Sequence, residues 1–325
     1  MNTFIILAAT FCISVASYAA PQVIDTDWKD AARERIVPLK LRIPEGTEKV
    51  PLVIFSHGLG GSRDGGKVWG EHWSANGYFV IHVQHPGSDK ALWLTGDGTL
   101  KQRVVRGATP EQLLGRVDDV RFVLDEIAKR QKNGDMQVSR IDLSRIAMTG
   151  HSFGAATAVA LADARNPGPI KSLGDSRIAA FIAFSPAVAG GQRSWPDRYG
   201  AMKSPFFSVT GTIDGEVIGN GTTPAKRAAL FDAQPPGDKY RVVFEGGDHF
   251  VFNGGELRES AVLPDLLGNT SAKTDPATAK VIYERTQRLT LKFLDAYLKG
   301  DGAAKAWLAN DAAKWIGDAG AWSAK

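Results

Sequence analysis

Short apolar runs recur along this chain, separated by segments with helical periodicity. The run PLVIFS at residues 51–56 is almost continuously apolar, which is typical of a strand buried on both faces of a sheet. The alternating segment at residues 36–43 indicates an early antiparallel strand. Further strands are expected at residues 78–83, 145–149, 177–184, 205–210 and 239–244, and helices at residues 67–75, 110–132, 153–164, 224–232 and 276–298. This order predicts an α/β fold with a mostly parallel central sheet and helices on both faces.

Two segments interrupt the alternation and are expected to be loops. Residues 87–108 are polar, contain glycines and carry Trp93, and residues 253–275 have no clear periodicity. Long loops at the carboxyl ends of strands commonly shape a binding site. The tail at residues 301–325 is expected to pack back onto the domain as an amphipathic helix.

The first residues of the chain have the pattern of an export signal. Residues 5–16 are largely apolar and carry no charged side chain, and residues 17–19 (SYA) form a small-residue cleavage pattern. The apolar run is too short to span a bilayer, so we expect a signal peptide over residues 1–19, cut after Ala19 or, as a second choice, after Ala20. A buried N-terminal helix or an anchor is the alternative. The protein is therefore expected to be secreted or periplasmic.

The only cysteine, Cys12, lies in this leader. The mature chain would then have no thiol, which excludes a structural disulfide, a cysteine nucleophile and a thiolate metal site. About 300 residues remain, which fit one large α/β domain. We expect a single domain over residues 20–325, with its core at about 35–300 and a C-terminal helical tail at 301–325.

The net charge of +4 is spread along the chain, and no Lys/Arg block stands out. No motif typical of nucleic-acid binding is present. No apolar stretch outside the leader is long enough to cross a membrane. We expect neither a nucleic-acid partner nor stable membrane insertion, and the sequence leaves the oligomeric state open.

The pentapeptide GHSFG at residues 150–154 lies between a predicted buried strand (IAMT) and a predicted alanine-rich helix (AATAVALA). In this context G-x-S-x-G is typical of a serine on a sharp strand-to-helix turn, with its hydroxyl exposed at the carboxyl edge of the sheet. Glycines are needed there because side chains would collide with the neighbouring strand and helix. We therefore interpret Ser152 as a nucleophile, with a purely structural turn as the alternative.

A serine hydroxyl is a poor nucleophile at neutral pH and needs a base, and histidine is suited to this because its pKa lies near working pH. His249 follows the last predicted strand, in EGGDHF, where this topology places the base. His85 follows an earlier strand and could line the pocket. The remaining histidines are expected to be structural: His57 and His151 in glycine motifs, His72 on a helix and His82 in a strand.

The third member must be a carboxylate that orients the imidazole and stabilises its cation. Asp214 lies in VTGTIDG, directly after the strand FFSV, in a loop that glycines make tight. The order serine, aspartate, histidine along the chain is one that such triads adopt. Asp197, Glu216 and Asp248 are the alternatives.

Two backbone amides are candidates for an oxyanion hole. The Phe153 N–H follows the serine at a helix N-terminus. The second donor should come from the loop SHGLGG at residues 56–61, where glycines let a backbone N–H turn toward the nucleophile, and we predict the Leu59 amide. A glycine turn with no donor role is the alternative.

In this order, HGLGG, GHSFG, TGTID and GGDHF resemble the α/β-hydrolase fold. SHGLGGSRDGG and the following WGEHWSANGYFVIHVQHPGSD are similar to the dienelactone-hydrolase-like and platelet-activating-factor-acetylhydrolase-like branch, and to bacterial cutinase-like polyester hydrolases. The resemblance covers about residues 35–300 and implies a carboxylic ester hydrolase without metal or organic cofactor. It implies that the nucleophile, acid and base fall on Ser152, Asp214 and His249, and the oxyanion amides on Leu59 and Phe153.

The chain also departs from these relatives. True dienelactone hydrolases use cysteine where this chain has Ser152. Secreted polyester hydrolases usually carry an aromatic side chain in the first oxyanion loop, where this chain has Leu59, and a C-terminal disulfide, for which this chain has no cysteines.

The predicted function is a secreted serine ester hydrolase that forms an acyl-enzyme and acts on short-chain esters. The alternatives are a polyester or acetylated-phospholipid hydrolase, an amide or thioester hydrolase on the same triad, and a catalytically silent binding protein on the same fold. A Rossmann enzyme is disfavoured because the loop lacks G-x-G-x-x-G. From loop position, the candidate substrate-binding residues are His85, Trp93, Phe153, Ser185 and Val217.

Overall fold

The computed structural model describes residues 21–94, 96–165, 172–186, 194–215, 221–255 and 272–325. Three predicted features lie outside this part of the chain. They are the leader with Cys12, the residues Glu216 and Val217, and most of the loop at 253–275.

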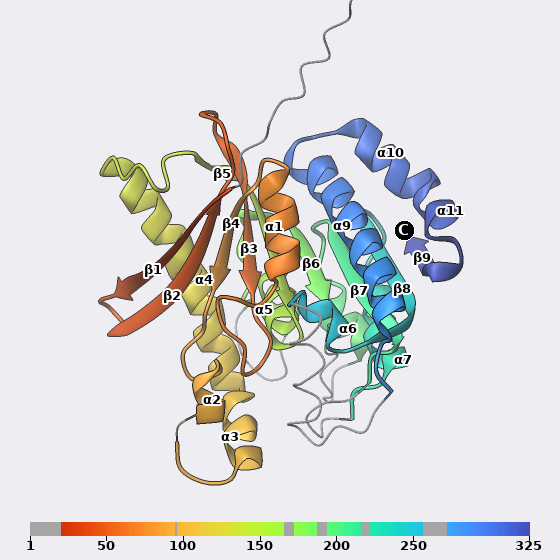
Figure 1. The fold of residues 1–325 in the computed structure, drawn as a ribbon, viewed down its shortest axis with the longest axis horizontal. Helices are drawn as coiled ribbons and strands as arrows, with labels where there is room; N and C mark the ends of the chain where they lie inside the picture. Colours follow the sequence, from red (N-terminus) through yellow and green to blue (C-terminus); the bar gives the residue numbers. More distant parts are fainter. Residues whose placement is uncertain (1–20, 95, 166–171, 187–193, 216–220, 256–271) are drawn as a thin grey trace, which may run out of the picture.

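The described residues form one nine-stranded sheet with the order β1-β2-β4-β3-β5-β6-β7-β8-β9 (Figure 1). Strands β3 to β8 pair in parallel, whereas β1, β2 and β9 pair antiparallel at the two edges. The strands are β1 (Gln22–Asp30), β2 (Arg35–Ile43), β3 (Val50–Ser56), β4 (Phe79–Val83), β5 (Ile141–His151), β6 (Ile178–Phe184), β7 (Phe206–Ile213), β8 (Lys239–Asp248) and β9 (Gly320–Ala324).

Helices cover both faces of the sheet, which confirms the predicted α/β architecture (Figure 1). One core cluster joins β3 side chains such as Leu52 and Ile54 to α4 and α5, and the other joins Val53 and Phe55 to α1 and α9. The helices are α1 (Lys67–Ala75), α2 (Ala91–Leu94), α3 (Leu100–Gly107), α4 (Pro110–Lys132), α5 (Phe153–Leu161), α6 (Trp195–Tyr199), α7 (Pro224–Ala233), α9 (Pro276–Leu298), α10 (Gly302–Asn310) and α11 (Ala312–Ile316), with short 3₁₀ turns η1 (Val251–Asn253) and η2 (Gly317–Ala319).

Helix α4 has the bounds that its sequence predicts, because its ends carry strong local signals. The Thr109 side chain accepts a hydrogen bond from the Gln112 N–H, and Pro110 occupies the first turn. Basic side chains in the last turn complement the negative end of the helix dipole. Buried side chains of the helix, such as Val117 and Val120, pack in the core cluster on one face of the sheet.

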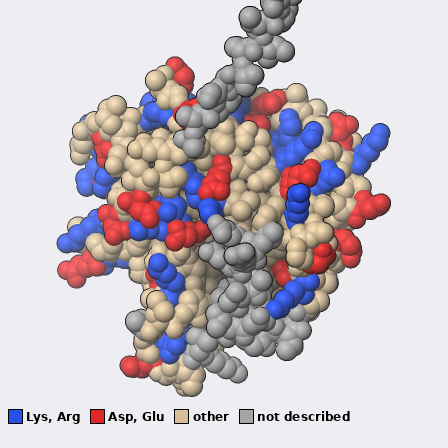
Figure 2. Space-filling model, in the orientation of Figure 1, with Lys and Arg blue, Asp and Glu red and all other residues tan. Residues whose placement is uncertain are grey.

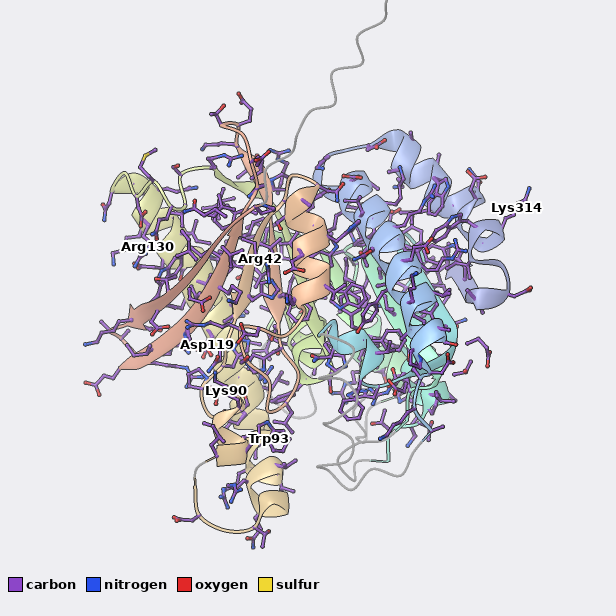
Figure 3. All side chains as sticks on the ribbon, in the orientation of Figure 1. Arg42, Lys90, Trp93, Asp119, Arg130 and Lys314 are labelled. Atoms are coloured by element: carbon purple, nitrogen blue, oxygen red, sulfur yellow. The ribbon has the colours of Figure 1, made fainter. Side chains whose placement is uncertain are left out.

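The segment at residues 87–108 was expected to be a loop, but it contains helices α2 and α3. A capping box between Thr99 and Gln102 begins α3. These helices are too short to show a periodic apolar stripe, which explains why the sequence pattern missed them. They project from the carboxyl end of the sheet, where Figure 3 shows the labelled Trp93.

The tail is only partly helical, contrary to expectation. After α10 and α11 the chain ends in strand β9, which pairs antiparallel with β8. Trp322 on β9 packs edge-on against Phe207 and lies 5.6 Å from the Tyr240 ring. The other edge strand, β1, also escaped prediction, because its charged side chains hide the strand pattern.

Positive and negative side chains are interspersed over the face drawn in Figure 2. Within the described ranges, no helix combines the length and the apolar character needed to cross a bilayer.

Candidate active site

Ser152 lies on a tight turn between β5 and α5, as the pentapeptide predicts. Its backbone has φ 54° and ψ −110°, a left-handed conformation that few residues other than glycine adopt. The flanking glycines permit close packing against β3: a Cβ on Gly154 would lie 1.9 Å from the carbonyl oxygen of Ser56. A Cβ on Gly150 would lie 2.5 Å from the Gly154 carbonyl. The turn therefore holds the serine side chain out at the edge of the sheet.

The structure brings together the three side chains that the sequence singled out. The Ser152 Oγ lies 2.9 Å from Nε2 of His249, and Nδ1 of His249 lies 2.9 Å from Oδ1 of Asp214. Because the carboxylate can only accept, Nδ1 carries the ring proton and Nε2 is free to accept the serine proton. This is the hydrogen-bond pattern that a base and its orienting acid require.

Asp214 is fully buried and directly follows β7. Its Oδ2 accepts from the Thr210 hydroxyl at 2.7 Å, and its Oδ1 lies 2.8 Å from Nε of Arg227. Burial by itself would raise the pKa of Asp214, but the charge of Arg227 and the hydrogen bond from His249 outweigh it and hold this pKa below its usual value.

Arg227 is a member of this site that sequence reasoning missed. It lies on α7, only 3% exposed, and its guanidinium donates to the carbonyls of Ser185 (2.8 Å) and Gly215 (3.0 Å) besides pairing with Asp214. Arginine on a helix is usually a surface residue, so nothing in the sequence marks it.

Burial lowers the pKa of His249, and the nearby positive charge of Arg227 lowers it further, while Asp214 partly offsets both. The imidazole is therefore neutral at neutral pH, the form in which it can accept a proton. His151 supports it from behind: its Nε2–H donates to the His249 carbonyl at 2.8 Å, and burial lowers the pKa of His151 to about 3.

The loop after β3 presents the predicted amide of Leu59. The Gly58 carbonyl accepts from Nδ1–H of His57 at 2.6 Å and from the Gly61 N–H at 3.1 Å. Among the residues that the structure describes, the N–H groups of Leu59 and Phe153 have no hydrogen-bond acceptor. Both amides are therefore free for a ligand.

The predicted substrate-binding residues differ in exposure and in their contacts. Trp93 is half-buried and its Nε1–H donates to the Gly60 carbonyl at 2.6 Å, so it covers the loop that carries Leu59. His85 and Ser185 are fully buried, and their role in substrate binding remains a prediction. Val217 lies outside the described residues.

The His85 side chain connects Ser56, at the end of β3, to helix α4. Its Nδ1–H donates to Asp119 on α4 at 3.0 Å, and its Nε2 accepts from the Ser56 hydroxyl at 2.8 Å. Figure 3 shows the labelled Asp119 farther into the molecule than Trp93. Loop position identified the right strand end for His85 but not the direction of its side chain.

Two of the alternative acids have other roles. Asp197 lies in the first turn of α6 and accepts from the Ser194 hydroxyl at 2.6 Å. Asp248 accepts from the N–H groups of Phe250 and Val251 and so shapes the turn around His249. Glu216 lies outside the described residues. In the described part of the chain no group of three or more His, Cys, Asp or Glu side chains could hold a metal ion.

A mostly parallel sheet, a serine on a strained strand-to-helix turn, and a histidine and a buried aspartate on later loops define the α/β-hydrolase class. The fold is thus the one that the sequence motifs predict.

Comparison of the sequence with known proteins shows which family of α/β hydrolases this chain resembles. Residues 36–96 match the family described as platelet-activating factor acetylhydrolase, isoform II. The chain is 25% identical over 306 residues to the platelet-activating factor acetylhydrolase of Cavia porcellus, an alignment that covers 83% of this chain. The chain spans 63% of that relative's length. These matches confirm the predicted resemblance to the platelet-activating-factor-acetylhydrolase-like branch of the α/β-hydrolase serine esterases.

Proposed function

We propose that this protein hydrolyses carboxylic esters, with Ser152 as nucleophile, His249 as general base and Asp214 as the acid that orients the imidazole. The observation that carries the proposal is the pair of 2.9 Å hydrogen bonds that connects the three side chains. Hydroxyl, imidazole and carboxylate in this order form a nucleophile that can act at neutral pH.

In the proposed cycle, Nε2 of His249 takes the proton of Ser152 as its Oγ attacks the ester carbonyl carbon. The amides of Leu59 and Phe153 donate to the oxygen that becomes negative. The carbon–oxygen bond to the alcohol breaks, and the alcohol leaves with the proton from His249. A water molecule then attacks the acyl-enzyme by the same route, which releases the acid and restores the serine.

Short-chain esters are the proposed substrates, and an acetylated phospholipid is the second candidate. The name of the Cavia porcellus relative specifies removal of an acetyl group, which supports a small acyl group. A polyester, an amide or a thioester would use the same triad, and a silent binding protein would use only the fold.

A substrate panel and an active-site label test the proposal together. We expect p-nitrophenyl acetate and butyrate to be hydrolysed faster than the palmitate ester, with an acetylated phospholipid and a polyester film assayed alongside. A fluorophosphonate probe should label Ser152, located by peptide mass spectrometry. A folded protein that neither turns over any of these esters nor takes the label would be the silent scaffold, and the proposal would be wrong.

The acid limb of the pH profile is expected to have its midpoint below 6.5, the ordinary pKa of histidine, because burial and Arg227 both lower the pKa of His249. As pH falls through this lowered pKa, the base becomes protonated and kcat/KM decreases. Arg227→Gln removes the positive charge, so the pKa of His249 should rise and the acid limb should move to higher pH. The measurement is kcat/KM for an aryl ester as a function of pH.

Lys226→Gln is the matched control for this shift. Lys226 is the neighbouring cation on α7, and its side chain donates to the Gly221 carbonyl rather than to Asp214, so its loss removes one positive charge without removing the ion pair with Asp214. We expect its profile to match the wild type. A midpoint at or above 6.5 in the wild type, or one that Arg227→Gln leaves in place, would contradict this account of His249.

We also propose that the enzyme is exported, on the basis of the leader pattern at residues 1–19. Amino-terminal sequencing of the protein from the native secreting cell should begin at Ala20, or at Pro21 for the second cleavage choice. A mature protein that begins at Met1 would show that the leader is retained.

A further inference from the structure

Arg116, on α4, lies fully buried behind the loop that carries Leu59. Its Nη1 donates to the His57 carbonyl at 2.6 Å. Its Nε donates to the Ser88 hydroxyl at 2.8 Å, and its Nη2 to the Ser88 carbonyl at 3.2 Å. One side chain thereby joins the loop after β3 to the loop after β4.

The same guanidinium helps to fix the peptide plane of Leu59. A peptide unit is planar and trans, so its N–H points opposite to its C=O. The C=O of this unit belongs to Gly58, which accepts from His57 Nδ1–H and the Gly61 N–H and lies 3.4 Å from Nη2 of Arg116. Donors gathered on the carbonyl side leave the Leu59 N–H directed away from Arg116.

The tautomer of His57 is also determined by its contacts. The His85 N–H donates to Nε2 of His57 at 3.0 Å, so Nε2 must be an acceptor and Nδ1 must carry the proton. Burial, followed by the charge of Arg116, holds the pKa of His57 well below its usual value. His57 therefore remains a neutral donor to Gly58.

Arg116 also contacts the residue that provides the second amide. The centre of its guanidinium lies 4.4 Å from the centroid of the Phe153 ring, within the range of a cation–π contact. A single cation thus touches both elements from which the proposed oxyanion hole is built.

This cation is buried without a close counter-ion. Its shorter hydrogen bonds end on neutral oxygens, and within the described ranges no carboxylate forms an ion pair with it, although Asp119 and Asp89 act on it from farther away. Burial lowers the pKa of Arg116 to about 9, which leaves it charged at neutral pH. An unpaired buried charge is costly unless something compensates it. A negative charge that develops on the substrate oxygen would do so.

We propose that Arg116 is a positioning residue for the oxyanion hole. It holds the Gly58–Leu59 peptide and the Phe153 ring in place, and its positive charge lies behind the oxygen that becomes negative. The inference rests on the proposed function, because it needs an oxyanion that forms on attack by Ser152. Arg116 is fully buried, so in this proposal it acts through the Gly58–Leu59 peptide and the Phe153 ring rather than by contact with the substrate.

The test compares Arg116→Met and Arg116→Lys with the wild type. Arg116→Met removes the charge and the forked donors, and we expect kcat for an aryl acetate to fall about 10²-fold with little change in KM, since the lost interactions act on the transition state. Arg116→Lys keeps the positive charge but loses the planar set of guanidinium donors, and its kcat should fall by about tenfold. Arg121→Met is the control: it lies on the same helix, donates to the Leu173 carbonyl and should leave kcat unchanged.

A trifluoromethyl ketone separates positioning from general structural damage. The Ser152 Oγ adds to its carbonyl carbon, the serine proton passes to His249, and the carbonyl oxygen becomes an oxyanion in the same hole. Its affinity should fall in Arg116→Met by about the same factor as kcat/KM. Affinity for the uncharged phenol that the aryl acetate releases should stay within about twofold of wild type.

A folded Arg116→Met variant whose kcat and ketone affinity both lie within threefold of wild type would overturn the inference. If that variant does not fold, Arg116→Lys decides, and a wild-type kcat in it would also overturn the inference. A wild-type protein that hydrolyses no ester and takes no label at Ser152 would refute the proposed function, and the role of Arg116 with it.

Discussion

Ser152→Ala is expected to lower kcat by at least ~10³-fold without unfolding the protein. Among the described residues, the Ser152 hydroxyl has a side-chain hydrogen bond to His249 alone, so its loss removes the proposed nucleophile and disturbs little else. The measurement is kcat for p-nitrophenyl acetate on purified protein, with circular dichroism and a thermal transition to show that the fold is kept.

Ser139→Ala is a suitable control, because Ser139 is a serine away from the site that donates only to the Met136 carbonyl. It should retain wild-type kcat. The residual rate of Ser152→Ala reflects the oxyanion amides and substrate binding. Near-normal turnover in this variant would show that the nucleophile has been wrongly assigned.

Asp214→Asn is expected to lower kcat by roughly 10³- to 10⁴-fold. The neutral amide cannot stabilise the imidazolium that forms on His249 during attack. It also leaves Arg227 buried without its counter-charge, so the free energy of unfolding should decrease by about 3 kcal/mol. Kinetics with an aryl ester and urea denaturation measure the two effects.

Asp197→Asn tests the alternative acid and should keep wild-type kcat, since Asp197 serves only the first turn of α6. The double variant Ser152→Ala/Asp214→Asn should be about as slow as Ser152→Ala alone, because the two residues act as a unit. Losses that multiply in the double variant would mean that Asp214 acts independently of the serine.

Local sequence signals identified the parts of the site that depend on short stretches of backbone. GHSFG predicted the turn at Ser152 because only glycine fits where Gly154 packs against Ser56. The position of Asp214 after β7 and of His249 after β8 followed from the order of strands, and both side chains meet Ser152 in the structure. Helices α1, α4 and α9 kept the predicted bounds since their ends carry caps, prolines or glycines.

Side-chain direction and long-range pairing were beyond the sequence. His85 and Ser185 follow strands at the carboxyl edge of the sheet, as the sequence predicts. Both side chains are nevertheless buried, because neighbouring elements cover them. Strand β9 is short, and its partner in the sheet is β8, more than seventy residues earlier in the chain. No local pattern encodes such a partner.

By itself, the sequence determined the fold class, the strained turn at Ser152 and the candidates for the acid and the base, because each rests on hydrophobic periodicity, on glycine at a crowded turn or on position after a strand. Only the tertiary structure decided that two arginines on separate helices, Arg116 and Arg227, lie buried beside the loops that carry the site. The physical reason is that a helical arginine faces water or the interior according to what packs over it, and those neighbours come from distant parts of the chain.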